Sequence, residues 1–156
     1  MSAVETMAPT RAEVEAYLHA QIPISAAMGV RVVEASESGV RLRAPLEPNI
    51  NHQSTVFGGS AAAIAILAGW TLLHVRLNRT GPESRIVIQN TYVHYDAPID
   101  GAIEVVTRPP DPVAWDRFTR TLERRGKARI EIGVDLEQDG ARAGGLSGAY
   151  VVMLEE

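Results

Sequence analysis

The chain has 156 residues, close to the ~150 residues of a typical domain. Its 15 Lys and Arg against 19 Asp and Glu give a formal net charge of −4. That charge argues against a general nucleic-acid-binding protein, which needs an excess of positive charge. Because the sequence contains no cysteine, disulfides, cysteine-ligated zinc, iron–sulfur clusters and a cysteine nucleophile are excluded.

The sequence gives no sign of secretion or of a membrane span. Met1–Pro9 carries Glu5 and lacks a basic start followed by an apolar run. No charged residue occurs between Glu47 and Arg76, but only Ala61–Val75 is mainly apolar, which is short of the ~20 residues that span a bilayer. We interpret this segment as a helix buried on nearly all sides of a soluble, cytoplasmic protein.

Local signals predict a series of short elements. Thr10 and Glu13 fit a capping box, and Asp139-Gly140 fits a hairpin turn. Gly144, Gly145 and Gly148 predict a bulge or bend in the last strand. In chain order we expect a helix over 10–21, strands over 30–34 and 40–46, an apolar helix from 58 to about 77, strands over 86–95 and 103–107, a helix over 111–126, and strands over 130–137 and 141–154.

This order predicts an α+β fold with a single antiparallel sheet. One helix that is apolar all round needs five or six strands to cover it, so the sheet should curl about that helix. Its many small residues would let the sheet approach closely. With no internal repeat or linker, we expect one domain over 1–156, of which 1–21 forms an N-terminal helical extension.

Two motifs surround the start of the apolar helix. The first is Pro48-Asn49-Ile50-Asn51-His52, and the second is Thr55-Val56-Phe57-Gly58-Gly59-Ser60. Leu67-Ala68-Gly69-Trp70 and Tyr95-Asp96-Ala97-Pro98 follow, with Gly101. Over residues 22–154 the chain resembles the hot-dog-fold thioesterase superfamily. It most resembles the "putative thioesterase" family, whose members occur alone or behind an acetyltransferase domain.

The resemblance implies a hot-dog fold, an antiparallel sheet wrapped around a long central helix. It implies acyl thioesters of CoA or of acyl carrier protein as substrates, and a homodimer or dimer of dimers with sites at the subunit interface. Some relatives are malonyl-ACP decarboxylases that supply acetyl-ACP to start fatty acid or polyketide chains, so decarboxylation is an alternative to hydrolysis. A third alternative is a non-catalytic module that binds acyl thioesters.

Gly58 and Gly59 are candidate oxyanion-binding residues. Two glycines that open a helix leave N–H groups unpaired with no side chain in the way, at the positive end of the helix dipole. Such donors suit a thioester oxygen that becomes an oxyanion or enolate. The alternative is that these glycines only allow close packing of helix and sheet.

The loop before the glycines supplies polar candidates. Asn51 could orient a carboxylate or a water, or its side chain could bond the loop backbone. His52 could donate to a carbonyl or accept a proton. Thr55 is a further candidate donor, as is Ser60, unless its hydroxyl caps the helix. We also predict substrate contacts from Phe57 and Tyr95, which belong to the motifs.

One departure from the family pattern bears on the reaction. Many relatives carry an Asp or Glu two turns after the paired glycines, whereas this chain has Ile66 there and no carboxylate between Pro48 and Val75. Hydrolysis needs a group that activates water, which leaves His52, a water held by an Asn, Glu47 or Asp96. Decarboxylation needs an oxyanion hole and a dry pocket but no nucleophile.

A basic cluster and four histidines complete the candidates. Arg124 and Arg125 belong to a run of cations from Arg117 to Arg129 that could attract a carrier protein or the phosphates of CoA, or could be a solvated helix face. The histidines share no metal-ligand spacing, so we expect neither a metal nor another cofactor.

Overall fold

Six strands and four α-helices make up the described part of the chain, which the computed structural model gives as residues 8–77 and 83–155. Residues 1–7 of the predicted N-terminal extension lie outside the described residues. The helices are α1 (Arg11–Gln21), α2 (Pro23–Ala27), α3 (Gly58–Leu77) and α4 (Pro112–Arg125), with a 3-10 turn η1 (Glu47–Asn49). The strands are β1 (Arg31–Ser36), β2 (Gly39–Ala44), β3 (Ser84–Tyr95), β4 (Ile103–Thr107), β5 (Lys127–Gln138) and β6 (Ala141–Leu154).

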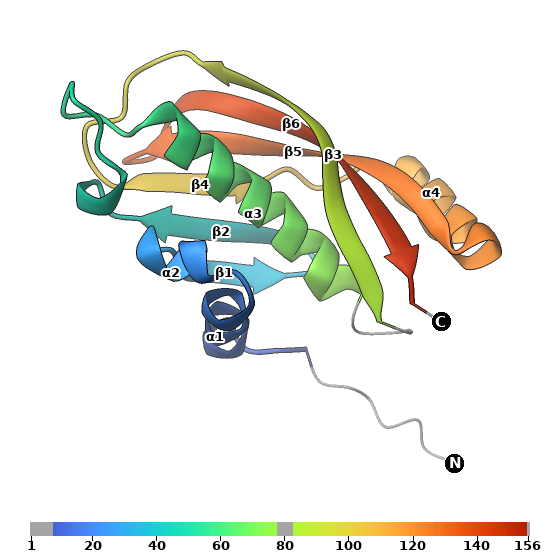
Figure 1. Ribbon diagram of the computed structural model, residues 1–156. Coiled ribbons are helices and arrows are strands. Elements are labelled where there is room, and N and C mark those ends of the chain that lie inside the picture. Colours follow the sequence, from blue (N-terminus) through green and yellow to red (C-terminus); the bar gives the residue numbers. More distant parts are fainter. Residues whose placement is uncertain (1–7, 78–82, 156) are drawn as a thin grey trace.

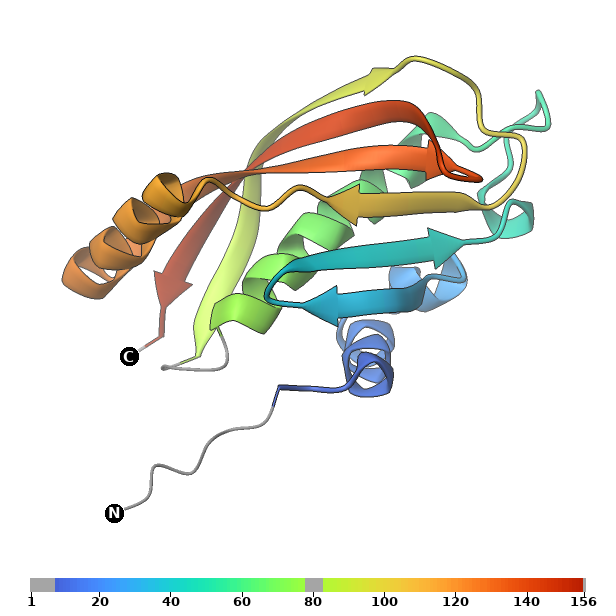
Figure 2. The same cartoon turned by 180° about the vertical axis from the view of Figure 1, so that it is seen from behind.

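All six strands join one sheet around α3. The strand order is β1-β2-β4-β5-β6-β3, and every neighbouring pair is antiparallel. Seen from behind, the strands lie in front of α3 (Figure 2), and seen from the other side α3 lies open between β3 and α2 (Figure 1). The predicted sheet curled about a long helix is therefore confirmed, and β1 and β3 are its two edges.

The inner face of α3 carries small residues because the sheet lies close to it. Ala61, Ala65 and Ala68 are buried there. The approach of the sheet is closest at Gly69, where a Cβ would overlap the hydroxyl of Tyr150 from β6. Tyr150 is fully buried and donates a hydrogen bond of 2.6 Å to the carbonyl oxygen of Ile66. Gly69 thus makes room for the largest fully buried side chain of the core.

The outer face of α3 is covered less than the sequence predicted. By length and composition alone α3 could span a membrane, but 56% of its apolar window is buried inside the protein, as is typical of a core helix. Ala62, Ala63, Ile66 and Trp70 are only half-buried. The expectation of burial on nearly all sides is wrong here, because the two edges of the sheet do not meet over this face.

Turn chemistry explains two further features. Asp139 and Gly140 both have positive φ, 49° and 81°, as a tight hairpin between twisted strands requires, so the predicted turn between β5 and β6 is confirmed. Leu136 pairs with Gly144 and Glu137 with Arg142, which leaves Ala143 as an extra residue beside the glycines. The sequence did not predict α2; Pro23 begins this helix because proline fits its first turn.

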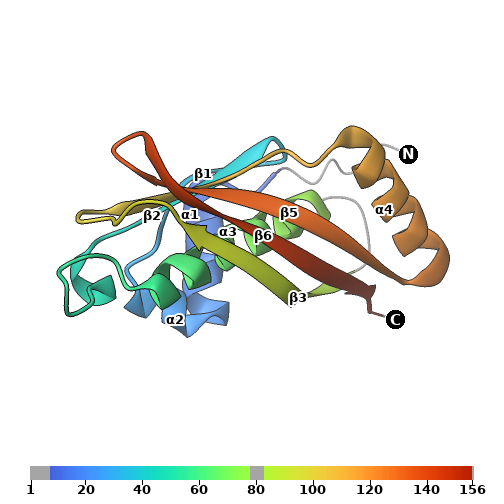
Figure 3. The ribbon, with the colours of Figure 1, turned by 90° about the horizontal axis from the view of Figure 1, so that it is seen from above.

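The helix α4 lies outside the sheet, between β4 and β5 in the chain. It begins after Asp111, which accepts from the N–H of Val113, and ends at Gly126 in a left-handed conformation with φ of 72°. Phe118 and Leu122 are its buried side chains. Seen from above, α4 lies at the opposite end of the molecule from the loop that precedes α3 (Figure 3).

Candidate functional site

The loop between η1 and α3 is fixed at both ends by Asn49. This side chain is buried, and its amide nitrogen donates to the carbonyls of Met28 and Pro45, at 2.9 and 2.8 Å. The backbone carbonyl of Asn49 accepts the N–H of Phe57 at 2.7 Å. Asn49 thereby sets where α3 begins. Sequence reasoning gave it no role, although it lies within the first motif, directly after Pro48.

Asn51 and Thr55 organise the tip of the same loop. The Asn51 Oδ1 accepts from the N–H groups of Gln53 and Thr55, at 2.9 and 3.1 Å. Its Nδ2 lies 3.0 Å from the Thr55 hydroxyl. Most of the hydrogen-bonding capacity of Asn51 thus goes to the loop itself, which is the alternative role that the sequence left open. His52 lies at the exposed tip.

The first turn of α3 presents unpaired N–H groups. The Ala61 N–H donates to the carbonyl of Phe57 at 3.1 Å, so Phe57 occupies the N-cap position and offers no polar side chain as a cap. Among the described residues, the N–H groups of Gly58, Gly59 and Ser60 have no hydrogen-bond partner. They lie at the positive end of the helix dipole, which favours a negatively charged oxygen.

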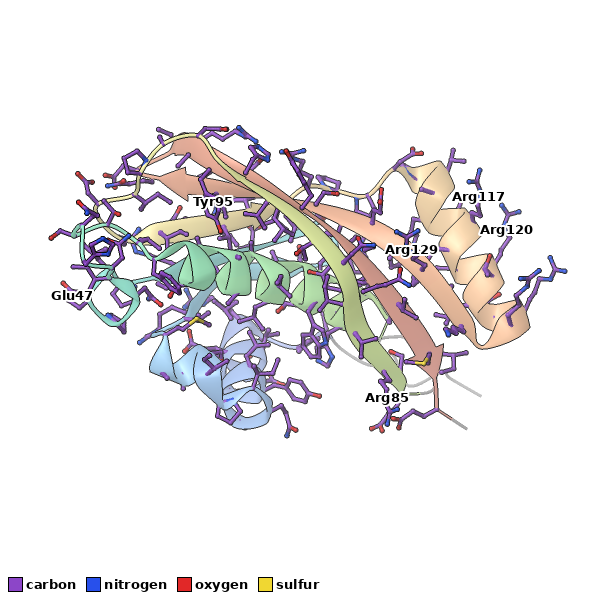
Figure 4. The ribbon with its side chains drawn as sticks, turned by 45° about the horizontal axis from the view of Figure 1, so that its top comes forward. Glu47, Arg85, Tyr95, Arg117, Arg120 and Arg129 are labelled. Carbon is purple, nitrogen blue, oxygen red and sulfur yellow. The ribbon has the colours of Figure 1, made fainter. Side chains whose placement is uncertain are left out.

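A cavity of about 270 Å³ opens beside this turn. Gly58 and Ala61 form its helix side, and the chain from Tyr95 to Ile99 forms the opposite side. The Tyr95 hydroxyl donates to the carbonyl oxygen of Gly58 at 2.7 Å, and its side chain reaches from β3 towards α3 (Figure 4). Partial burial raises the pKa of Tyr95, so the phenol stays protonated and remains a donor at neutral pH.

Gly58 and Gly59 differ in their surroundings. A Cβ on Gly58 would lie 3.3 Å from the ring and hydroxyl of Tyr95, whereas a Cβ on Gly59 would overlap the ring of Phe57. Gly59 is exposed and does not line the 270 Å³ cavity. Tyr95 therefore lies against Gly58 and Phe57 against Gly59. A methyl group at Gly58 would make a tight contact with Tyr95, and one at Gly59 would require the exposed Phe57 ring to move.

The carboxylate nearest the cavity is already paired. Asp96 lines the cavity, and its Oδ2 lies 2.8 Å from Arg142. Arg142 also bonds Asp135 at 3.2 Å and His94 Nε2 at 2.9 Å, where the ring nitrogen must accept because a guanidinium only donates. Hydrogen bonds from Arg108 and Arg142 lower the pKa of Asp135. Sequence reasoning missed this network.

The predicted site residues fall into three places. Phe57, Gly58, Gly59, Ser60 and Tyr95 meet at the start of α3, with Asn51 and Thr55 in the adjoining loop. His52 and Glu47 are exposed, and neither of them lines the 270 Å³ cavity beside Gly58. Arg124 and Arg125 lie on α4, far from α3's start in the same chain. Within residues 8–77 and 83–155, no three His, Asp or Glu side chains are placed to hold a metal ion.

The fold and site place the protein in a known class. One antiparallel sheet curved around a central helix, with paired glycines opening that helix beside a cavity, defines a hot-dog-fold protein of the thioesterase superfamily. More narrowly, the chain belongs to the family described as "Putative thioesterase (yiiD_Cterm)", whose model matches residues 11–154.

Solved structures agree with this assignment. A "putative thioesterase" from Shewanella oneidensis is 29% identical, with a TM-score of 0.80 over 93% of this chain and 97% of that one. A protein of unknown function from Chlorobaculum tepidum TLS is 27% identical, with a TM-score of 0.85 over 93% and 94% of the two chains. A "probable thioesterase" from Pseudomonas aeruginosa shares the fold at 22% identity, with a TM-score of 0.77 over 94% and 98%.

Proposed function

We propose that the protein hydrolyses acyl thioesters of CoA or of an acyl carrier protein at the start of α3. The observation that carries this proposal is the set of unpaired N–H groups of Gly58, Gly59 and Ser60 beside the 270 Å³ cavity. A thioester oxygen held there gains negative charge as water attacks the carbonyl carbon. Donors already aimed at this oxygen stabilise the transition state, by roughly 3 kcal/mol for one donor.

The attacking water needs a base that accepts its proton. A single subunit has few residues that could do this near the start of α3. The Asp96 carboxylate is paired with Arg142, and the described part of α3 carries no Asp or Glu. We assign the role of base to His52, whose imidazole can accept the proton of the attacking water when the two lie within hydrogen-bond reach. Because His52 is exposed at the loop tip, it would act on a site completed by a second subunit.

A homodimer, alone or paired into a dimer of dimers, is part of this proposal. Among the described residues the edge strand β3 pairs with only one strand, β6, and it exposes Val87, Ile88 and Tyr92. A free edge with apolar side chains favours pairing with a second copy, and a two-fold axis would use the same strand from both chains. Light scattering should give the mass of a dimer or tetramer, and a monomer would contradict this part.

Malonyl-thioester decarboxylation is the second candidate, favoured by the absence of a carboxylate from α3. Loss of CO₂ leaves an enolate whose oxygen the same N–H groups would bind, and no nucleophile is required. A carboxylate near the substrate's own carboxylate would repel it. The two reactions therefore share the oxyanion site. Hydrolysis also needs a base that activates water, whereas decarboxylation needs surroundings without a carboxylate.

One experiment separates the candidates. The protein is incubated with malonyl-ACP, malonyl-CoA and a series of acyl-CoAs, and both free thiol and the mass of the acyl group are followed. Since the chain has no cysteine, a thiol reagent detects only released CoA or carrier. Free thiol supports hydrolysis, loss of CO₂ with the thioester intact supports decarboxylation, and binding without either product indicates a non-catalytic module.

A further inference from the structure

The outer edge of β1 is occupied by α1 rather than by another strand. Among the described residues β1 pairs only with β2, and α1 lies beyond β1, on the side away from β2 (Figures 1 and 2). Val14 and Leu18 anchor this helix, since both side chains are buried. A helix packed against a sheet edge shields the outward N–H and C=O groups of the strand from water, so these groups need other partners.

Two side chains of α1 supply those partners. The Glu15 carboxylate accepts the N–H of Val32 at 2.9 Å. His19 Nε2 lies 2.7 Å from the carbonyl oxygen of Val30, and this ring nitrogen must donate because a carbonyl oxygen only accepts. Glu15 and His19 are four residues apart and therefore share a face of α1. The helix thus presents one acceptor and one donor to the edge of the sheet.

This pair of hydrogen bonds copies the pattern of a neighbouring strand. In an extended chain the backbone groups of alternate residues point to the same side, so the carbonyl of Val30 and the N–H of Val32 both point away from β2 and flank Arg31. A strand added to this edge would donate to the first group and accept from the second. A second copy of the chain therefore cannot pair with this stretch while α1 is in place.

The two edges of the sheet differ in this respect. β1 has six residues, and α1 bonds its first part through both a donor and an acceptor. β3 has 12 residues, and among the described residues one side chain bonds its backbone, Trp70 Nε1 to the carbonyl of Ile86. Residues 87–92, which follow, are exposed. The β3 edge can thus meet another chain where the β1 edge cannot.

We propose that α1 is an intramolecular blocker of the β1 edge, in which Glu15 and His19 take the place of a strand, and that it confines edge-to-edge association of this chain to β3. Pairing of one edge about a two-fold axis closes after two copies, whereas two pairing edges on each chain build an open-ended assembly. The blocking does not depend on the reaction at the start of α3, so thiol release is not a readout of its test.

Amide hydrogen exchange at Val32 tests the contact in the folded chain. The Val32 N–H should be protected in the parent protein although it points away from β2. Glu15→Ala should speed its exchange roughly fivefold or more, whereas Glu15→Gln keeps an acceptor oxygen and should stay within about twofold of the parent. Equal rates in Glu15→Ala and the parent would overturn the contact on which the blocking depends.

Ala16→Pro tests the blocking itself. Proline breaks a helix when it stands in the interior, and Ala16 is exposed in the middle of α1, so this variant frees the β1 edge without changing a core side chain. Arg11→Pro is the matched control, because proline is tolerated at the first position of a helix. In sedimentation velocity the mass of Ala16→Pro should rise with concentration above the parent's mass, and Arg11→Pro should keep the parent's mass.

The result is independent of whether β3 forms the proposed homodimer. If the parent is a monomer, freed β1 edges should give dimers, and if it is already a dimer or tetramer, they should give longer assemblies. A mass equal to the parent's at every concentration would overturn the proposal in either case.

Exchange at Val32 also separates edge pairing from misfolding. In Ala16→Pro the amides of β5 and β6 should stay protected, which shows that the sheet is folded. Val32 should exchange fast in dilute protein and become protected again as the larger species form. Larger species in which Val32 still exchanges fast would overturn the proposal. If Ala16→Pro does not fold, the double variant Glu15→Ala, His19→Ala is measured against the same outcomes.

Discussion

Tyr95 donates a hydrogen bond of 2.7 Å to the carbonyl oxygen of Gly58, and so joins the last residue of β3 to the first residue of α3. The contact fixes the helix start relative to the sheet edge without using the N–H groups of that turn. Those donors are therefore held in place yet remain available to a ligand.

Replacing Tyr95 with Phe removes this bond and keeps the ring. We expect the free energy of unfolding to fall by about 1 kcal/mol, the usual net value of one hydrogen bond, and kcat to fall more than KM rises because the oxyanion donors lose their support. Urea unfolding and steady-state thiol release measure the two effects. Tyr17→Phe, at an exposed position on α1, is the control, and an equal loss in both variants would contradict the role of Tyr95.

Gly59→Ala should separate activity from stability. Gly59 does not have a positive φ, and alanine favours a helix over glycine by up to about 1 kcal/mol, so the melting temperature should hold or rise. The new methyl group displaces the Phe57 ring and crowds the N–H groups of the first turn. The rate of thiol release should therefore fall at least tenfold. Complete loss of one oxyanion donor typically lowers kcat by ~100-fold or more. Full activity in this variant would show that the carbonyl binds elsewhere.

Asn51 tests whether the loop supports the site or takes part in it. Asn51→Ala loses the acceptor for two backbone N–H groups and should cost about 1 kcal/mol of stability, together with most of the activity. Asn51→Asp keeps an acceptor oxygen in the same place. If Asn51 only builds the loop, Asp restores activity to within a few fold; if its amide touches substrate, Asp stays as inactive as Ala.

The ion pairs of Asp135 predict acid sensitivity. Arg108 and Arg142 lower its folded-state pKa below the value of about 3.9 in an unfolded chain. Its contribution to stability is thus present above that pH and is lost as the pH falls through the folded-state pKa. Urea unfolding is measured from pH 6 down to about pH 3. At pH 6 the Asp135→Asn variant should have a lower free energy of unfolding than the parent protein, and this free energy should fall less than the parent's as the pH is lowered. Parallel curves for variant and parent would contradict this.

The cations of α4 give a test of carrier preference. Arg117 and Arg120 project from α4 (Figure 4), and Arg124 and Arg125 end it, with no carboxylate within 4.0 Å among the described residues. Replacing Arg124 and Arg125 with Glu should slow the reaction with carrier-bound substrate severalfold, more so at low salt, and change CoA substrates less. The charge-matched control replaces Arg11 and Arg31, and equal losses on both substrates would rule out docking on α4.

Local signals in the sequence predicted those parts of the protein that depend on neighbouring residues. The paired glycines marked the start of α3, and Asp139-Gly140 marked the hairpin, because turns and helix ends follow from nearby side chains. The apolar character of Ala61–Val75 identified the central helix, although not the open face at Ile66 and Trp70. That face depends on how far the edges of the sheet reach around the helix.

Long-range contacts were beyond such reasoning. Asp96 and Arg142 are 46 residues apart in the chain, and only the pairing of β3 with β6 brings them together. Asn49 binds carbonyls of Met28 and Pro45, which no local pattern indicates. The sequence thus identified the residues around the start of α3. It did not reveal that Asn51 forms hydrogen bonds within its own loop or that Asp96 forms an ion pair with Arg142.

The hairpin at Asp139-Gly140 also bears on how the chain reaches its native state. It connects two of the longest strands, of 12 and 14 residues, through a two-residue turn, whereas β3 reaches its partner β6 from a distant part of the chain. Contacts between sequence neighbours form at the lowest entropic cost. We therefore expect this hairpin to be structured in the rate-limiting step, and substitutions there to slow refolding rather than to speed unfolding.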